Sequence, residues 1–283
     1  MASEECDQLV ANLKRLQLRH AAHSLDDHLR DAARLKLGHL GFLARVIEAE
    51  VLARTETAAT RRIREAHFPE TCRIEDYDFK LQPSLDRKVI LDLGELGFLD
   101  RCESVFFLGP SGVGKSHLSI GLGVKACAAG YGVLYVRAYD MLKRLLAAIA
   151  EETFDEVLET YCRPNLLILD EVGNHPAHPI AAELGFAGIF YELVHQRHRH
   201  GATILASNLG VNDWAVALGG APALVATALD RLLEGAHIVA FPSEAPSYRM
   251  NRERGPGPLP RLRHRRRRNS CVAPSRRRLK QVP

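Results

Sequence analysis

The chain has 283 residues, of which 46% are hydrophobic and 25% are charged, as in an ordinary water-soluble protein with one or two buried cores. Its longest apolar runs are too short to cross a bilayer, and its acidic N-terminus lacks the pattern of a secretory signal. The six cysteines are scattered without a Cys-x-x-Cys pair, which fits a reducing compartment. We therefore expect a cytoplasmic protein that has no membrane partner.

Charge is distributed unevenly along the chain. The net charge of +4 combines +11 in the segment from Arg252 onward with −7 in everything before it. That segment is rich in Arg and Pro and has no apolar periodicity, which predicts a disordered tail over 251–283. Two zones precede it: a helical zone over 1–70, expected to form an N-terminal domain, and a zone over 71–250 in which strands and helices alternate.

The first zone has apolar residues at helical spacing in two stretches, which begin at Leu9 and at Leu40. Between them, Ser24 is followed by Leu25 and two aspartates, and this pattern predicts a helix that starts there with Ser24 as its N-cap. The second stretch ends in a basic cluster, which is either a solvated helix face or a contact for nucleic acid. The cluster consists of Arg54, Arg61, Arg62 and Arg64.

The second zone alternates short apolar runs with helical segments. We predict strands over 105–108, 132–136, 166–170, 202–207 and 237–241, and helices over 115–129, 139–150, 181–199 and 223–233. Strict alternation of this kind is typical of an α/β fold in which helices cover both faces of a parallel sheet.

Residues 109–116, Gly-Pro-Ser-Gly-Val-Gly-Lys-Ser, match the phosphate-loop pattern GxxxxGK(S/T) between a predicted strand and a predicted helix. Glycines let the backbone turn its N–H groups toward phosphate oxygens, and the following helix adds its positive N-terminal end. Lys115 is expected to reach the β- and γ-phosphates, and Ser116 to bind Mg²⁺. The sequence therefore predicts an ATP-binding P-loop NTPase.

Two carboxylates follow the apolar run at 166–169. Asp170 is suited to hold Mg²⁺, and Glu171 is suited to polarise the water that attacks the γ-phosphate. The alternative is a buried strand that simply ends in an acidic turn. A small-molecule kinase has no need of Glu171, because its nucleophile is a substrate hydroxyl, so the pair favours hydrolysis.

Other polar and aromatic residues have two interpretations each. Asn208, at the end of a predicted strand, either faces the nucleotide or closes a turn. Arg231 either projects to the γ-phosphate of a neighbouring subunit or pairs with Asp230 or Glu234 in its own chain. Tyr77 and Phe79, ahead of the core, either flank the adenine or pack against the protein.

These residues belong to a pattern that runs from about Leu9 to Arg249 and resembles the IstB-like ATP-binding proteins of the AAA+ superfamily, close relatives of the DnaC-type helicase loaders. The segment at 82–87, ahead of the phosphate loop, is more distinctive of the family than the loop itself. The segments that carry the resemblance are 13–16, 66–69, 74–79, 82–87, 169–173, 207–209, 229–233 and 247–249.

The resemblance implies a three-layer AAA+ sandwich behind a small helical N-terminal domain that serves self-association or partner contacts. It implies a Walker A motif, a Walker B motif, a sensor 1 residue and an arginine finger that completes the site of the next subunit in a homo-oligomer. The implied catalytic residues are Glu171, Lys115, Asn208 and Arg231; the implied metal ligands are Ser116 and Asp170; the implied nucleotide-binding residues are Gly109, Pro110, Ser111, Gly112, Val113, Gly114, Lys115, Ser116 and His117.

The family also implies a function: ATP-driven assembly on double-stranded DNA, recruitment or stimulation of a transposase at a target site, and disassembly on hydrolysis. A DnaC-type loader of a replicative helicase is the nearest rival. A regulatory DNA-binding protein that holds ATP without turnover and a small-molecule kinase are further alternatives. The intact Asp170–Glu171 pair argues against the regulatory protein.

The sequence departs from the family at three places. Residues 172–175 replace the usual apolar and aromatic run after Glu171, and Ala206 stands where a Thr commonly precedes the Ser-Asn pair. Family members usually end soon after the Ser-Tyr-Arg element at 247–249, whereas here an arginine-rich segment follows. This segment is either a readthrough or frameshifted extension or a DNA-binding arm, and its loss is expected to leave the ATPase intact.

Overall fold

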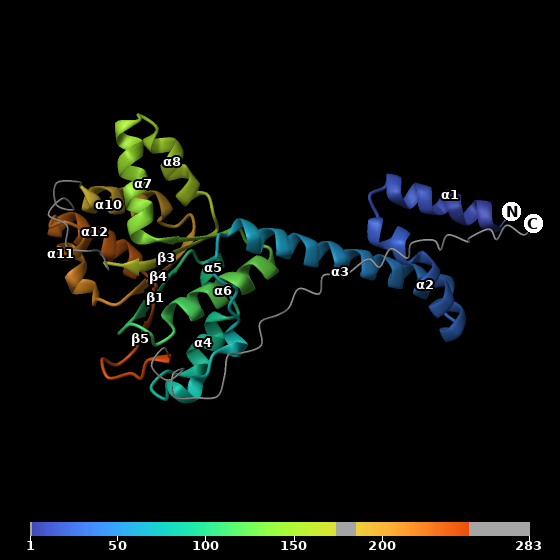
Figure 1. Ribbon diagram of the computed structural model, residues 1–283, viewed down its shortest axis with the longest axis horizontal. Helices are drawn as coiled ribbons and strands as arrows, with labels where there is room; N and C mark the ends of the chain where they lie inside the picture. Colours follow the sequence, from blue (N-terminus) through green and yellow to red (C-terminus); the bar gives the residue numbers. More distant parts are fainter. Residues whose placement is uncertain (1, 174–184, 249–283) are drawn as a thin grey trace, which may run out of the picture.

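The computed structural model describes residues 2–173 and 185–248 (Figure 1). Its α-helices are α1 (Ala2–Arg15), α2 (Arg19–Leu35), α3 (His39–Glu65), α4 (Arg87–Leu93), α5 (Gly97–Asp100), α6 (Lys115–Ala129), α7 (Ala138–Ala150), α8 (Phe154–Cys162), α10 (Phe186–Arg197), α11 (Trp214–Ala217) and α12 (Pro222–Leu233). Its strands are β1 (Ser104–Leu108), β2 (Val133–Arg137), β3 (Leu166–Val172), β4 (Ala202–Ser207) and β5 (His237–Ala240). Short 3-10 helices are η1 (Ile74–Asp76), η2 (Phe79–Leu81) and η3 (Val211–Asp213).

The five strands form one parallel sheet in the order β2-β3-β4-β1-β5. Side chains alternate between its faces, so each central strand is buried on both sides. Phe107 and Ile168 pack toward α6 on one face, whereas Phe106 and Leu169 pack toward α7, α10 and α12 on the other. Figure 1 shows the helices on both sides of the sheet. The predicted three-layer α/β sandwich is confirmed.

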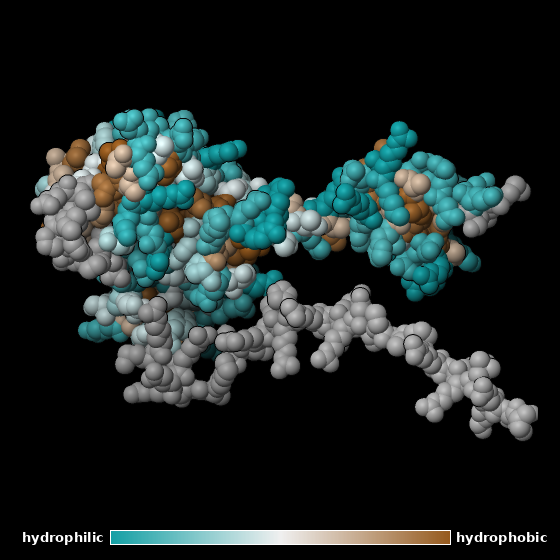
Figure 2. Space-filling view, turned by 45° about the horizontal axis from the view of Figure 1, so that its top comes forward, coloured by the Kyte–Doolittle hydropathy of each residue, from teal (hydrophilic) through white to brown (hydrophobic). Residues whose placement is uncertain are grey.

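Helix α3 connects the sandwich to α1 and α2 (Figure 1). It has 27 residues, and its last turn packs on α6, where Arg62 donates a hydrogen bond to the carbonyl oxygen of Cys127 (3.4 Å). At the other end, large apolar side chains stay exposed, among them Leu16 at 68% and Leu40 at 81%. Figure 2 shows hydrophobic surface among the polar residues of this part. In the described part of the chain, no helix is both long and apolar enough to cross a membrane.

The predicted N-cap at Ser24 is wrong. Helix α2 begins at Arg19, and the Ser24 hydroxyl lies inside it, donating back to the carbonyl of His20 (2.7 Å). The start of α2 is instead capped from α3, because the N–H of Ala21 donates to a carboxylate oxygen of the buried Glu50 (2.8 Å). A cap that comes from another helix leaves no local sequence signal.

The predicted strands and helices of the core agree with the observed ones to within a few residues. The predicted helix 115–129 coincides with α6, and strand β3 runs two residues beyond its predicted end at Asp170. Helix α10 ends two residues before the predicted Arg199, and residues 181–184 of that prediction lie outside the described residues. The same holds for the tail predicted as disordered over 251–283. Helices α4, α5, α8 and α11 were not predicted.

Candidate nucleotide-binding site

The loop at 109–116 joins β1 to α6, and its backbone conformation depends on glycine. Gly112 and Gly114 have φ angles of +84° and +96°, in the left-handed region that side chains disfavour. A Cβ atom on Gly114 would lie 2.5 Å from Tyr77 Cε2, and one on Gly112 would overlap the Ser247 hydroxyl. Both glycines are therefore required by the loop conformation and by the side chains behind it.

Lys115 lies at the start of α6 with its ammonium folded back onto the loop. Its Nζ donates to the carbonyl oxygens of Gly109 (2.7 Å) and Pro110 (2.8 Å) and to the side-chain oxygen of Asn208 (2.6 Å). The side chain is buried, at 7% exposure. The site thus holds a positive charge at the mouth of a loop whose glycine conformations suit phosphate binding.

Asn208 follows β4 and accepts the hydrogen bond from Lys115 Nζ. From the sequence, Asn208 had two interpretations: it faces the nucleotide or it closes a turn. The turn after β4 is closed by its neighbour instead, because the N–H of Leu209 donates to the Ser207 hydroxyl (3.0 Å). The Ser207 hydroxyl in turn donates to the carbonyl of Val172 on β3 (2.7 Å). The Asn208 side chain is therefore free of a capping role, and it meets the phosphate-loop lysine.

Asp170 and Glu171 occupy a bulge near the end of β3. Leu169 pairs with Leu205 and Val172 pairs with Ser207, so β3 has one more residue than β4 in this interval. Glu171 has a φ angle of +57°, a left-handed conformation that costs a non-glycine residue about 1–3 kcal/mol. Asp170 is 5% exposed, whereas Glu171 is exposed. The bulge gives adjacent carboxylates different environments.

The Asp170 carboxylate is held by two hydrogen bonds. Its Oδ1 accepts from the Glu171 N–H (2.9 Å), and its Oδ2 accepts from the hydroxyl of Tyr135 on β2 (2.7 Å). Burial, together with the charge of Asp170, raises the pKa of Tyr135 above its ordinary value, so the hydroxyl keeps its proton. Tyr135 is a site residue that was not predicted from the sequence.

The loop is also supported from behind by the segment that ends at Tyr248. The N–H of Tyr248 donates to the Gly112 carbonyl (2.8 Å), and its hydroxyl donates to the Asp78 carbonyl. Gln82 is fully buried and donates to the Pro246 carbonyl (2.6 Å). Gln82, from the segment 82–87, thus holds the residues that lead to Tyr248, which supports the phosphate loop.

Tyr77 packs and does not present a free face to a ligand. Its hydroxyl donates to the Val113 carbonyl (2.8 Å), and its ring contacts those of Phe79, His117 and Tyr248 at centroid distances of 4.9–5.8 Å. At 5% exposure it supports the loop. Of the two interpretations of Tyr77, packing is the one that the structure favours.

Arg231, on α12, forms neither of the ion pairs that the sequence offered as alternatives. Its guanidinium lies 5.2 Å from the centre of the Tyr191 ring, and its Nη1 is buried without a hydrogen-bond partner among the described residues. Glu234 pairs instead with Arg199 (2.8 Å) and His198 (3.2 Å). Arg231 is thus a cation without a carboxylate partner in the described chain.

A glycine loop between a parallel strand and a helix, a buried lysine in that loop and an acidic bulge on another strand of the sheet define a P-loop NTPase of the AAA+ type. The chain belongs to the family of IstB-like ATP-binding proteins, whose sequence profile matches residues 11–255. The Walker A and Walker B motifs and the Ser207–Asn208 pair lie within the match.

Individual relatives agree with the family assignment. The insertion sequence IS21 ATP-binding protein of Pseudomonas aeruginosa is 34% identical over 89% of this chain and 92% of its own length. The IS5376 ATP-binding protein of Geobacillus stearothermophilus is 34% identical over 75% of this chain and 82% of its own. An insertion-sequence ATP-binding protein of Mycobacterium tuberculosis is 33% identical, with 88% and 97% covered.

Solved structures are similar at a lower level. AMPPCP-bound DnaA from Aquifex aeolicus has 22% identity and a TM-score of 0.49, with 62% of this chain and 51% of that chain covered, so this chain spans about half of it. The DnaC helicase loader has 18% identity and a TM-score of 0.45, with 55% and 87% covered. The assignment rests on the family match and on the site, and these likenesses add no weight to it.

Proposed function

We propose that this protein is an ATPase that assembles with ATP on double-stranded DNA, recruits or stimulates the transposase of its insertion sequence at a target site, and disassembles on hydrolysis. The observation that carries the proposal is the bulge that sets an exposed, strained Glu171 beside the buried Asp170, in a family of insertion-sequence ATP-binding proteins. Backbone strain of this kind clusters at functional sites.

The oxygen donors of Ser116 and Asp170 are of the kind that Mg²⁺ binds. This ion prefers hard oxygen ligands and is usually held by one or two carboxylate or hydroxyl groups together with the phosphates of its nucleotide. Ser116, in the first turn of α6, and the buried Asp170 are oxygen donors of this kind. When bound, the ion would offset negative charge on the triphosphate.

Glu171, Lys115 and Asn208 would each have a distinct role in hydrolysis. The Glu171 carboxylate would accept a proton from the attacking water, and its exposure gives that water access. The Lys115 ammonium would exchange its contacts with the Gly109 and Pro110 carbonyls for phosphate oxygens. Asn208, which already contacts Lys115, would orient the groups at the γ-phosphate.

Oligomer formation is proposed from Arg231. Arg231 is partly exposed and has no carboxylate partner in the described chain, so its guanidinium gains from an outside anion, because charge-assisted hydrogen bonds to phosphate are about twice as strong as neutral ones. The γ-phosphate bound by a neighbouring subunit is such a partner, which makes ATP the ligand that joins subunits. The exposed apolar side chains of α1–α3 offer a second surface for association.

Two observations support contact with DNA and with a transposase: the basic cluster of α3 and the names of the relatives. Within the predicted basic cluster, Arg54 is engaged by Glu50, Arg61 by Glu65 (3.8 Å) and Arg62 by the Cys127 carbonyl, whereas Arg64 is exposed at the end of α3. Arg64, and the exposed pair of Arg61 with Glu65 once it opens, are the positions of the cluster that would meet phosphates. The names of the relatives refer to insertion sequences, and this favours a transposase over a replicative helicase as partner.

The proposal is tested by following assembly and phosphate release together. Wild-type protein and Glu171→Gln are mixed with ATP and duplex DNA, and the size of the complexes is measured by light scattering. We expect both to assemble, the wild type to disassemble as phosphate appears, and Glu171→Gln to stay assembled. Glu156→Gln, an exposed change on α8, is the matched control and should behave like wild type.

Three results would contradict the proposal: no phosphate release by the wild type, equal assembly with ADP, or normal hydrolysis by Glu171→Gln. Capture of proteins on the full chain with ATP then identifies the partner. A replicative helicase in place of a transposase would support the helicase-loader alternative.

A further inference from the structure

The Tyr135 side chain connects the Asp170 carboxylate to a neighbouring strand. Tyr135 lies on β2, where it pairs with Ile168 of β3, and its hydroxyl reaches Asp170 Oδ2 at 2.7 Å. With the Glu171 N–H on Oδ1, each carboxylate oxygen has one protein donor. A carboxylate accepts about four hydrogen bonds, so two acceptor positions remain for a metal ion or its waters.

Tyr135 is itself fixed by the turn that follows α3. Its N–H donates to the Ala66 carbonyl (2.9 Å), and its ring packs edge-on against Phe68 with centroids 6.3 Å apart. Phe68 is seated on α6, where a Cβ atom on Gly123 would lie 2.8 Å from the Phe68 ring. The turn directly after α3 therefore holds both the backbone and the ring of Tyr135, the residue that bonds Asp170.

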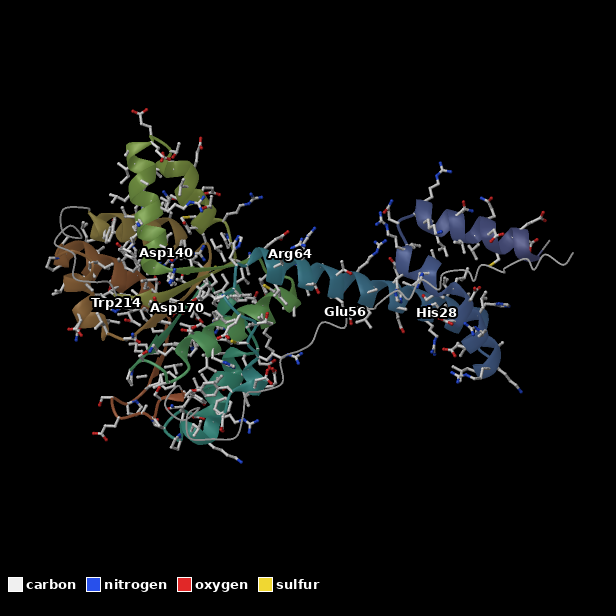
Figure 3. All side chains as sticks on the ribbon, in the orientation of Figure 1. His28, Glu56, Arg64, Asp140, Asp170 and Trp214 are labelled. Carbon is white, nitrogen blue, oxygen red and sulfur yellow. The ribbon has the colours of Figure 1, made fainter. Side chains whose placement is uncertain are left out.

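Helix α3 extends from this turn to the N-terminal helices (Figure 1). Figure 3 shows Glu56 and Arg64 at successive places along α3, between His28 on α2 and the core that contains Asp170. A helix transmits displacement along its axis because its backbone is hydrogen-bonded throughout. A movement of α3 would thus act on the tyrosine first and on the carboxylate through it.

We propose that Tyr135 is a positioning residue for the Mg²⁺-binding carboxylate Asp170 and that it links this carboxylate to the end of α3. The inference rests on the proposed function, since it takes Mg²⁺ with a nucleoside triphosphate as the ligand. Residues that orient a metal ligand typically change metal affinity or activity by about 10- to 100-fold when they are replaced. Without the hydroxyl, the carboxylate has to be ordered each time the metal binds.

The test measures the binding of a fluorescent ATP analogue to the full chain as Mg²⁺ is titrated. In Tyr135→Phe, which keeps the ring and its contact with Phe68, we expect the half-saturating Mg²⁺ concentration to rise about tenfold. The affinity for the ATP analogue in EDTA, where no Mg²⁺ is free, should equal that of the wild type. A general loss of structure would lower this affinity as well, so the comparison isolates the metal ligand. Tyr131→Phe is the matched control, because Tyr131 also donates to an aspartate, Asp100 (2.7 Å), outside the site.

A second variant tests the link to α3. Phe68→Leu leaves the Tyr135 hydroxyl in place and removes the ring that supports it, so we expect a shift in the same direction of about two- to threefold. An unchanged Mg²⁺ dependence in Phe68→Leu would overturn the link to α3. An unchanged dependence in Tyr135→Phe would overturn the positioning role. If Mg²⁺ does not change the affinity of the wild type for the ATP analogue, the metal site itself is refuted. The positioning role of Tyr135 and its link to α3 then fail with it.

Discussion

Lys115 Nζ donates a 2.6 Å hydrogen bond to the side-chain oxygen of Asn208, which lies 93 residues further along the chain. The lysine is the first residue of α6, the helix that follows β1 and its loop, and the asparagine directly follows β4. Strands β1 and β4 are parallel neighbours, so their carboxyl ends meet at one edge of the sheet. The pair unites two residues that were predicted separately, one from a motif and one from the end of a strand.

Replacing Lys115 with Ala should weaken ATP binding by about 10- to 100-fold, because a hydrogen bond to a charged group contributes about 1.5–3 kcal/mol. The loss has two origins, since the ammonium also bridges the carbonyls of Gly109 and Pro110 and so stabilises the loop. Equilibrium binding of a fluorescent ATP analogue measures the effect. Lys125→Ala, a partly exposed change on the same helix, serves as control. Undiminished affinity in Lys115→Ala would refute the phosphate-loop assignment.

Arg231→Ala should bind ATP normally and lose hydrolysis by at least about 100-fold, since arginine fingers contribute about 10³–10⁵ in rate. Mixing it with Glu171→Gln should restore part of the activity. At a mixed interface, the intact Arg231 of one subunit completes the site that retains Glu171 in the other. Phosphate release at varying mixing ratios measures this complementation. The trans role fails if the mixture stays inactive or if Arg231→Ala alone hydrolyses at the wild-type rate.

Arg199→Ala is the control for that experiment. Arg199 forms an exposed ion pair with Glu234, just after the end of α12, the helix that carries Arg231, and exposed pairs contribute at most about 1 kcal/mol. Its removal should therefore leave hydrolysis and complementation unchanged. A loss equal to that of Arg231→Ala would indicate a general defect of α12.

The site residues that could be predicted from the sequence are those that lie together in one short segment. The residues at 109–116 specify a strand, a turn and a helix within one motif, and Asp170 and Glu171 directly follow an apolar run. The bulge that separates their environments depends on the register between β3 and β4. A register shift of one residue has no signature in either strand alone.

The role of Tyr135 and the contacts of Tyr248 behind the loop could not be predicted from the sequence, because both depend on which distant segments lie side by side. Tyr135 looks like any aromatic residue of a buried strand until β2 is placed beside β3. Tyr248 lies 136 residues after Gly112, the residue whose carbonyl it bonds, and no periodicity connects them. Local patterns predicted the elements, whereas contacts between distant segments had to be observed.

A chain shortened to end at Arg249 should bind ATP as the full chain does, whereas one ending at Ala245 should bind about tenfold more weakly. The shorter chain loses the Tyr248 hydrogen bonds to Gly112 and Asp78, and it removes the acceptor of the buried Gln82 amide. An unsatisfied buried donor costs about 1–3 kcal/mol. Nucleotide affinity and thermal unfolding measure the two chains. Lost binding in the chain that ends at Arg249 would contradict the view that the ATPase does not need the segment after it.

Acid should loosen the packing of α2 on α3 through Glu50. Burial alone would raise the pKa of this carboxyl, but hydrogen bonds from the Ala21 N–H and from Arg54 (both 2.8 Å) outweigh it and hold the pKa below its ordinary value of 4.5. A lowered pKa in the folded state means that the carboxylate stabilises the fold fully above pH 4.5. This contribution is lost as the pH falls through the folded-state pKa.

Glu50→Gln should therefore lower the free energy of unfolding at pH 7 by about 1–3 kcal/mol, because it weakens the cap of α2 and the pair with Arg54. It should also flatten the dependence of stability on pH below 4.5, since the titrating group is gone. Urea unfolding followed by circular dichroism at several pH values measures both effects. Glu56→Gln changes an exposed carboxyl on the same helix (Figure 3) and should do neither. If Glu50→Gln matches wild type at pH 7, the cap from α3 does not stabilise α2.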